Sequence, residues 1–274
     1  MSVDGSAQVI YPLASVYLET SLPADVLSAC ASSLSGAHCS QQGVGMFGEN
    51  PIRKKAPDSE TLWVEEVFRT LQGEGPYSGV PSTFVRLSGC NLQCYWCDTQ
   101  FEAFRWSMTP QAIVEMIRGL EAPVPELVVL TGGEPFRQSI APLIQVFLDE
   151  GFKVQIETNG TIYQAIPTGQ DVTVVCSPKT PVLDLRMIEI ITHYKYVLAH
   201  GEIDEVDGLP GTSTQRAGKK ARLFRPPQGK PVYVMPRDDY DEQRNKDNLK
   251  ACIDVATRQG YTLNMQLHKL LNLP

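Results

Sequence analysis

Three cysteines, Cys90, Cys94 and Cys97, lie within eight residues of one another and follow the spacing C-x3-C-x2-C. A tetrahedral structural zinc site takes four ligands, so three thiolates are an incomplete set for it. They suit a [4Fe-4S] cluster, because thiolates hold such clusters and a missing ligand leaves one iron open to a small molecule. The alternative is a zinc site that a distant Cys or His completes, although common zinc patterns use paired C-x2-C units. The spacing therefore favours an iron–sulfur cluster.

Apolar runs typical of buried strands alternate with helical patterns along the chain. Strands are predicted at 62–68, 82–88, 126–131, 153–157, 171–176, 194–198, 232–236 and 261–268, and helices at 109–120, 140–150 and 241–259. This alternation indicates an α/β protein with a parallel sheet. Residues 201–230 show no strong periodicity and predict a long loop.

Each polar or glycine-rich motif follows a predicted strand. Active sites of parallel α/β proteins form at this carboxyl edge of the sheet. The motifs expected to face one cavity are the cysteine loop, Thr131–Pro135, Glu157–Asn159, Ser177–Lys179 and Met235.

Several of these residues have chemistry that suits a small ligand. Arg86 lies inside a predicted strand, so its guanidinium must pair with a carboxylate of the protein or of a ligand. The backbone amides of Gly132 and Gly133 are expected to be open to an anionic or amino-acid ligand, because no Cβ blocks its approach. Glu157 and Ser177 suit ribose hydroxyls or an ammonium group, with capping of the following turn as an equal alternative.

The remaining histidines and cysteines receive simpler interpretations. His268 lies on the last predicted strand and is expected to reach the cavity, whereas His193 and His200 are expected to be structural or at the surface. Cys176 and Cys252 are interpreted as buried small hydrophobic residues.

A basic segment without acidic residues runs from position 215 to 230. Its charged residues are Arg216, Lys219, Lys220, Arg222, Arg225 and Lys230. Such a run is usually a solvated loop. The alternative hypothesis is a docking surface for an acidic electron donor, since a redox cluster must be reduced by a partner protein.

The composition restricts the class of protein. The 274 residues, 42% of them hydrophobic, are enough for one substantial core. A formal net charge of -7 and a pI near 5.2 provide no basic field for nucleic acid. No apolar run is long enough to predict a membrane span. Seven cysteines, an odd and clustered set, fit a reducing compartment better than a disulfide framework, so a cytoplasmic protein is expected.

The first 45 residues differ from the rest of the chain, since the first basic residue is Arg53. Neither a secretory signal nor a transit peptide has this composition, and a disordered tail is expected. We therefore divide the chain into 1–45, a disordered or misannotated extension whose native start is hypothesised at Met46, and a catalytic domain at 46–274. Detection of residues 1–45 in the endogenous protein by mass spectrometry would refute the Met46 start.

From about Met46 to Pro274 the chain resembles the 7-carboxy-7-deazaguanine synthases, a family of the radical S-adenosylmethionine (SAM) superfamily. The cysteine loop, Gly132-Gly133 and Ser177-Pro-Lys occur widely in that superfamily. The discriminating stretches are Leu71-Gln-Gly-Glu-Gly75 and the ending His268-Lys-Leu-Leu-Asn-Leu-Pro274. The resemblance implies a partial (abbreviated) parallel α/β barrel, usually as a homodimer.

The resemblance also implies a carbon–nitrogen lyase reaction that forms part of queuosine, or 7-deazapurine, biosynthesis. One electron from the [4Fe-4S] cluster splits SAM, and the resulting radical takes the C6 hydrogen of 6-carboxy-5,6,7,8-tetrahydropterin. The ring contracts, ammonia leaves, 7-carboxy-7-deazaguanine forms and SAM is regenerated. The implied electron donor is flavodoxin-like.

The same resemblance assigns roles to individual residues. Cys90, Cys94 and Cys97 hold the cluster, and Thr99 coordinates Mg2+ alongside ligand oxygens. The implied substrate contacts are Leu71, Gln72, Gly73, Arg86, Thr131 and the carboxylate of Pro274, and the implied SAM contacts are Trp96, Cys97, Asp98, Gly133, Ser177, Pro178 and Lys179.

Two other functions are kept as alternatives. An activase for a glycyl-radical enzyme shares the cysteine spacing, but its protein substrate would leave Gln72 and Arg86 without a role. A zinc-stabilised binding module is the second alternative, and it would be colourless, whereas an iron–sulfur protein is brown.

Overall fold

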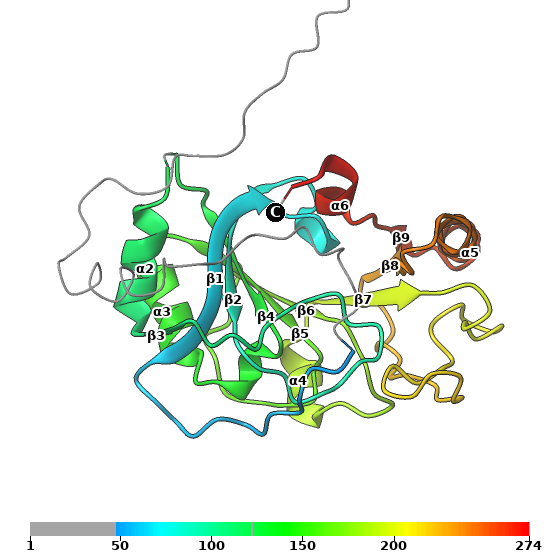
Figure 1. Ribbon diagram of the computed structural model, residues 1–274, viewed down its shortest axis with the longest axis horizontal. Helices are drawn as coiled ribbons and strands as arrows, with labels where there is room; N and C mark the ends of the chain where they lie inside the picture. Colours follow the sequence, from blue (N-terminus) through cyan, green and yellow to red (C-terminus); the bar gives the residue numbers. More distant parts are fainter. Residues whose placement is uncertain (1–47, 122, 274) are drawn as a thin grey trace, which may run out of the picture. The chain divides into compact units, whose positions relative to one another are not determined.

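The computed structural model describes residues 48–121 and 123–273, and these residues fall within one compact unit. The predictions for positions 1–45 and for Pro274 lie outside the described residues. A nine-stranded sheet has the order β3-β1-β2-β4-β5-β6-β7-β8-β9 (Figure 1). Its strands are β1 Leu62–Leu71, β2 Pro81–Leu87, β3 Trp106–Met108, β4 Leu127–Gly132, β5 Lys153–Thr158, β6 Val172–Cys176, β7 His193–Leu198, β8 Val232–Pro236 and β9 Thr262–Leu263.

The sheet is mostly parallel and open. β1 pairs antiparallel with β2 and β3, whereas every pairing from β2 through β9 is parallel. Within the described residues β3 and β9 end the strand order and do not pair, so the barrel is incomplete. The predicted α/β fold with a partial parallel barrel is confirmed.

Helices connect the strands and shield the core. They are α2 Pro110–Arg118, α3 Ala141–Asp149, α4 Leu185–Ile190, α5 Glu242–Gln259 and α6 Leu267–Leu271, with short 3-10 turns η1 Gly75–Tyr77 and η2 Pro135–Arg137. Helices α2 and α3 lie together beside the β1 end of the sheet, and α5 lies beside β8 and β9 (Figure 1). No helix in the described ranges has both the length and the apolar character needed to cross a membrane.

Local sequence explains these elements. The Thr109 side chain accepts a hydrogen bond from the amide of Ala112 at 3.2 Å and caps α2, and Pro110 occupies its first turn. Ile113 and Ile117, four residues apart, bury the same face of this helix. All five residues of β6 are buried, as expected for a central strand of a parallel sheet.

The C-terminal prediction was wrong in part. The run 261–268 was expected to be one strand, but only Thr262–Leu263 pairs with β8, and α6 begins at Leu267. The Asn264 side chain accepts a hydrogen bond from the amide of Gly75 at 2.8 Å. The chain therefore turns toward the loop after β1 instead of continuing along the sheet. The short β3 and α4 were also not predicted.

The long loop 201–230 is confirmed, since it contains no helix or strand. Part of it forms a small hairpin, which we call the 212–220 hairpin, closed by an antiparallel bridge between Thr212 and Lys220. The amide of Tyr95 donates a hydrogen bond to the carbonyl of Thr214 at 3.0 Å, which joins this hairpin to the cysteine loop.

Candidate active site

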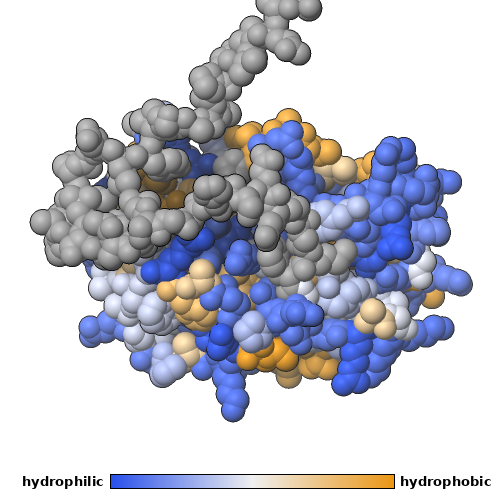
Figure 2. Space-filling view, viewed as in Figure 1, coloured by the Kyte–Doolittle hydropathy of each residue, from blue (hydrophilic) through white to orange (hydrophobic). Residues whose placement is uncertain are grey.

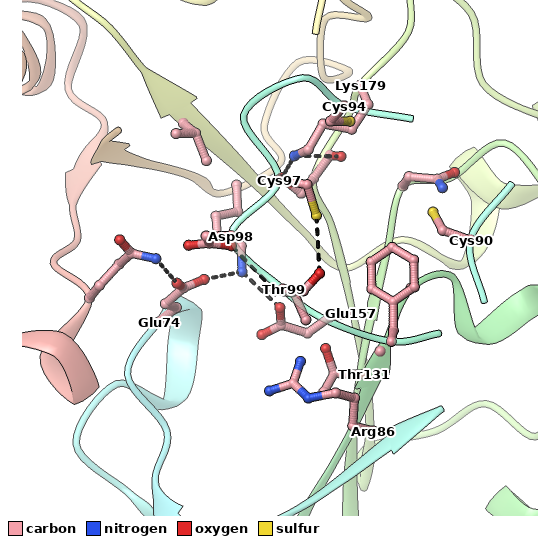
Figure 3. Close-up of a pocket in the computed structure, with 18 of the residues that line it drawn as sticks. Glu74, Arg86, Cys90, Cys94, Cys97, Asp98, Thr99, Thr131, Glu157 and Lys179 are labelled. Atoms are coloured by element: carbon pink, nitrogen blue, oxygen red, sulfur yellow. Dashed lines mark hydrogen bonds and ion pairs between the residues drawn. The ribbon is translucent and has the colours of Figure 1, made fainter. Parts of the chain in front are cut away.

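The carboxyl ends of six strands surround a cavity of about 510 Å³ (Figure 3). Residues at the ends of β2, β4, β5, β6, β7 and β8 line it, and α6 contributes from the C-terminus. The cysteine loop, Thr131–Gly133, Glu157–Asn159, Ser177, Lys179 and Met235 all line this cavity. The expected meeting of these motifs at one edge of the sheet is confirmed.

The three cysteines of the loop line the cavity as free thiols. Cys94 Sγ lies 3.5 Å from Thr214 Oγ1, and Cys97 Sγ lies 3.6 Å from the carbonyl of Thr99. Within residues 48–121 and 123–273, no three His, Cys, Asp or Glu side chains converge where a single metal ion would bind. Three thiols that line one cavity suit a [4Fe-4S] cluster, which three thiolates would hold with one iron left open.

Burial keeps the Cys90 and Cys97 thiols protonated in the metal-free protein. It raises the pKa of Cys90 to about 12 and that of Cys97 to about 11, and the nearby Glu134 and Asp98 carboxylates add to the respective effects. Metal binding must therefore displace protons from buried sulfur.

Gly133 allows the β4 turn to approach the cysteine loop. A Cβ at this position would lie 2.2 Å from the carbonyl oxygen of Gly89 and 2.8 Å from the amide of Cys90. The amide of Gly133 donates to the carbonyl of Leu87 at 3.2 Å. The expectation that this amide is open to a ligand was therefore wrong, since the missing Cβ serves backbone packing.

Glu134, the next residue, is fully buried and joins the ends of β4 and β5. It accepts hydrogen bonds from Thr158 Oγ1 and the amide of Asn159, both at 2.7 Å, and from the amide of Phe136 at 3.1 Å. Burial raises the pKa of Glu134 to about 7 despite these three donors.

We call one part of the cavity the cysteine side and define it by Cys90, Cys94, Cys97, Gly133, Ser177 and Lys179. Figure 3 shows the three cysteines and Lys179 in its upper half. The Lys179 ammonium contacts Ser177 Oγ and lies 5.3 Å from the centre of the Trp96 ring. Burial lowers the pKa of Lys179. Pro178 lines a small separate pocket instead. The predicted SAM-contacting residues apart from Pro178 thus line the same cavity.

We call a second part of the cavity the ion-pair side and define it by Glu74, Arg86, Glu157, Lys195 and His268. Figure 3 shows Glu74, Arg86 and Glu157 in its lower half. Lys195 is 5% exposed, and its ammonium pairs with Glu157 at 2.8 Å and with Glu74. Despite burial, this pairing raises the pKa of Lys195 and lowers the pKa of Glu74 to about 2. One buried ammonium and two partly buried carboxylates thus stabilise one another beside the cavity.

The predicted substrate contacts divide into two groups. Gln72, Arg86 and Thr131 line the cavity, whereas Leu71 and Gly73 do not. Arg86 pairs with Glu66 at 3.0 Å, as expected for a half-buried guanidinium that needs a carboxylate. The roles of these residues remain predictions.

Helix α6 is anchored beside the cavity by charge pairs. Lys269 pairs with Asp98 at 2.9 Å and with Asp238 at 3.1 Å, so the helix is fixed to the cysteine loop and to the segment that follows β8. A Cβ at Gly73 would lie 2.4 Å from His268 Nδ1, which explains the glycine in the loop after β1. His268 lines the cavity as expected, whereas the described His193 and His200 do not.

The sequence analysis missed several residues of the site. Lys195 lies inside β7 among buried tyrosines, and the rule applied to Arg86, that a charge within a strand needs a partner, would have identified it. The other lining residues without a prediction include Asn50, Glu66, Glu74, Arg237, Asp238, Gln266 and Lys269. Thr99 lines the cavity, with its hydroxyl 3.3 Å from Asp98 Oδ1.

Comparison with known proteins defines the class. Residues 84–203, which hold the cysteine loop and the strand-end motifs through β7, match the model of the radical SAM superfamily. The fold is similar to that of a solved structure titled "Crystal structure of QueE from Escherichia coli", with a TM-score of 0.55 and 23% identity over 75% of this chain and 94% of that one.

Curated relatives define the family. A 7-carboxy-7-deazaguanine synthase of Rhodospirillum rubrum is 50% identical over 83% of this chain and 100% of its own length. One of Rickettsia prowazekii is 38% identical over 83% of this chain and 96% of its own length. The chain belongs to the 7-carboxy-7-deazaguanine synthase family of radical SAM enzymes.

Proposed function

We propose that this chain converts 6-carboxy-5,6,7,8-tetrahydropterin to 7-carboxy-7-deazaguanine and ammonia. The supporting observation is that two sets of side chains share one cavity: three cysteines that suit a [4Fe-4S] cluster, and an arginine that suits a substrate carboxylate. Substrate and products balance in atoms and electrons, so the reaction consumes no net oxidant. When bound, the cluster and SAM supply the radical that starts the ring contraction.

The chain's own residues bind and orient the substrate. Arg86 pairs with Glu66, whose side chain is 47% exposed. We propose that the substrate carboxylate replaces this exposed partner, because a guanidinium binds a carboxylate through two parallel hydrogen bonds. Glu157 accepts from Gln72 Nε2 at 3.2 Å and is held by Lys195. Its fixed carboxylate suits the N–H groups of the pterin ring.

The decisive experiment uses protein purified without oxygen and reconstituted with iron and sulfide. It is mixed with SAM, Mg2+, dithionite and the carboxytetrahydropterin, and the product is identified by mass spectrometry. Formation of the deazaguanine with little net loss of SAM is expected. Cleavage of SAM without that product would refute the substrate and leave the glycyl-radical activase alternative, and a colourless zinc protein would refute the cluster.

We propose Mg2+ as a third cofactor, bound by Thr99 Oγ1 together with substrate oxygens. Hard cations prefer oxygen ligands, and this hydroxyl lines the cavity between the cysteine side and the ion-pair side (Figure 3). Replacement Thr99→Val should raise the Mg2+ concentration needed for half-maximal activity while the cluster's visible spectrum is unchanged. An unchanged Mg2+ requirement would refute this ligand.

We also propose an acidic, flavodoxin-like electron donor that docks on the 212–220 hairpin. Arg216, Lys219 and Lys220 are exposed there and form no ion pair with a described residue. The side-chain Nε2 of Gln215, in the same hairpin, lies 3.8 Å from Cys94 Sγ. A donor docked on this hairpin would therefore be close to the cluster. The other basic residues do not add to this surface, since Arg222 and Arg225 each pair with Asp207 at 2.7 Å.

The donor hypothesis predicts a selective kinetic effect. Reversing the charges at Arg216, Lys219 and Lys220 should slow cluster reduction by flavodoxin at least tenfold at low salt, with unchanged reduction by dithionite. The control reverses Arg244, Lys246 and Lys250, which are exposed on α5, where Figure 2 shows a hydrophilic surface. Equal effects in both triple variants, or slower reduction by dithionite, would refute the docking site.

We also propose a homodimer, which the family resemblance implies, and a cytoplasmic location, which the cysteine content predicts. Sedimentation velocity of the reconstituted protein tests the first, and fractionation of the source cells tests the second.

A further inference from the structure

Arg137 is a buried cation directly behind the first cysteine of the loop. It ends η2, after the Gly-Gly-Glu-Pro turn, and only 6% of its surface is exposed. A Cβ added at Gly89 would lie 2.7 Å from Nη2 and 2.9 Å from Cζ of Arg137. The guanidinium therefore packs against the backbone of the residue that precedes Cys90.

No carboxylate pairs with this guanidinium among the described residues. Its Nη1 donates to the carbonyl of Lys54 at 2.9 Å, its Nη2 donates to the carbonyl of Ser88 at 3.3 Å, and its Nε has no hydrogen-bond partner in the described ranges. The nearby Glu102 carboxylate is bound by Arg53 at 2.8 Å, and the Arg53 charge offsets part of the effect of Glu102 on Arg137. Burial lowers the pKa of Arg137, although not enough to remove its charge.

Such a charge is costly to bury, and the same protein shows the usual solution at Lys195, where two carboxylates compensate the cation. Because no carboxylate pairs with Arg137, its positive charge acts on the groups around it. Cys90 is one of these groups, since the guanidinium packs against Gly89, the preceding residue.

We propose that Arg137 tunes the reduction potential of the iron–sulfur cluster by placing an uncompensated positive charge behind Cys90. This inference rests on the proposed function, in that the three cysteines must hold a cluster. Reduction adds one negative charge to a cluster already surrounded by thiolates. A buried cation stabilises the reduced form more than the oxidised form, because the interaction is weakly screened in the protein interior. Removal of the charge should therefore lower the potential.

The alternative is a purely mechanical role, since Arg137 also links the carbonyls of Lys54 and Ser88. Two replacements separate the alternatives. Arg137→Lys keeps the charge and loses most of the hydrogen bonds, whereas Arg137→Gln keeps an amide donor and loses the charge. The matched control is Arg53→Gln, because Arg53 donates its backbone amide to Cys90 but has an exposed side chain that is paired with Glu102.

The measurement is an EPR-monitored redox titration of the reconstituted proteins without substrate, with iron and sulfide content determined in parallel. We expect a lower potential in Arg137→Gln, a potential close to wild type in Arg137→Lys, and a smaller shift in Arg53→Gln, whose charge is screened by solvent. If Arg137→Gln alone loses the cluster while Arg137→Lys keeps a normal potential, this result would also support a role for the positive charge of Arg137.

Other outcomes overturn the inference. These are an unchanged potential in Arg137→Gln at equal iron content, equal shifts in both Arg137 variants, or loss of the cluster from both. Failure of the wild-type protein to bind iron would instead refute the proposed function.

Discussion

The two sides of the cavity manage buried polar groups in opposite ways. On the cysteine side, burial keeps Cys90 and Cys97 as neutral thiols whose pKa values are raised. On the ion-pair side, the Lys195 ammonium pairs with two carboxylates, and this pairing raises the pKa of Lys195 and lowers that of Glu74. One side thus depends on metal to become charged, whereas the other is complete in the protein alone. Changes on the ion-pair side should therefore affect folding, and those on the cysteine side should affect cluster chemistry.

The replacement Lys195→Met is the strongest test of whether the ion-pair side stabilises the fold. It leaves the partly buried Glu74 and Glu157 carboxylates close together without a cation, so we expect the free energy of unfolding to fall by about 3 kcal/mol. Urea denaturation of the metal-free protein measures this. The control is Lys153→Met, since the Lys153–Glu126 pair is exposed and should contribute less than about 1 kcal/mol.

A triple replacement distinguishes charge compensation from packing at the same place. Adding Glu74→Gln and Glu157→Gln to Lys195→Met removes the unpaired charges and should restore part of the lost stability. A triple variant less stable than Lys195→Met would contradict the view that the three charges act as one compensated group.

Acidification tests the ion-pair side without mutation. The pKa of Glu74 falls from 4.5 to about 2 in the folded protein, so its stabilisation is present above pH 4.5 and is lost as the pH falls toward 2. The free energy of unfolding of the wild type should decrease over this range. The decrease should be smaller in Lys195→Met, where the cation that lowers this pKa is missing, and equal slopes would contradict the assignment.

The two sides also differ in how far the sequence predicts them. Cys90, Cys94 and Cys97 lie close together in the chain, and Gly133 and Ser177 follow recognisable strands, so spacing and strand ends were enough. The ion-pair side depends on long-range contacts: Lys195 and Glu74 are separated by 121 positions. Neither local periodicity nor propensity reports which strands become neighbours, and the pairing could not be predicted.

The same reason explains the errors in the fold. Long buried strands such as β4 and β6 were predicted because their apolar residues are consecutive. The run after α5 carries similar residues, but Asn264 and Leu267 bond to the loop after β1, which is far away in the sequence. Tertiary contacts therefore decided where the last strand ended.

Glu134 is a buried carboxylate that follows Gly133 of the cysteine side, and it accepts hydrogen bonds instead of forming an ion pair. In Glu134→Gln, either orientation of the amide places an NH2 group against a backbone N–H, of Phe136 or of Asn159. We expect a loss of about 2 kcal/mol in unfolding free energy at pH 5, measured by urea denaturation. Retention of full stability would mean that these amides have other acceptors.

The pH dependence gives this prediction a second test. The folded-state pKa of Glu134, about 7, lies above the ordinary 4.5, so its stabilisation is fully present below pH 4.5 and is lost as the pH rises through 7. The gap between wild type and Glu134→Gln should therefore narrow from pH 5 to pH 8. A widening gap would contradict the raised pKa.

The smallest expected effect comes from Thr214→Val in the 212–220 hairpin, next to Cys94. The hydroxyl donates to the carbonyl of Lys179 at 3.0 Å and lies 3.5 Å from Cys94 Sγ. Because its single proton is directed to Lys179, it cannot also donate to a thiolate at Cys94. Loss of this hydroxyl should cost about 1 kcal/mol of stability in urea denaturation. It should leave the reduction potential of the cluster unchanged, in contrast to Arg137→Gln. A lower potential in Thr214→Val would show that hydrogen bonding to sulfur, and not only buried charge, controls the cluster from this side.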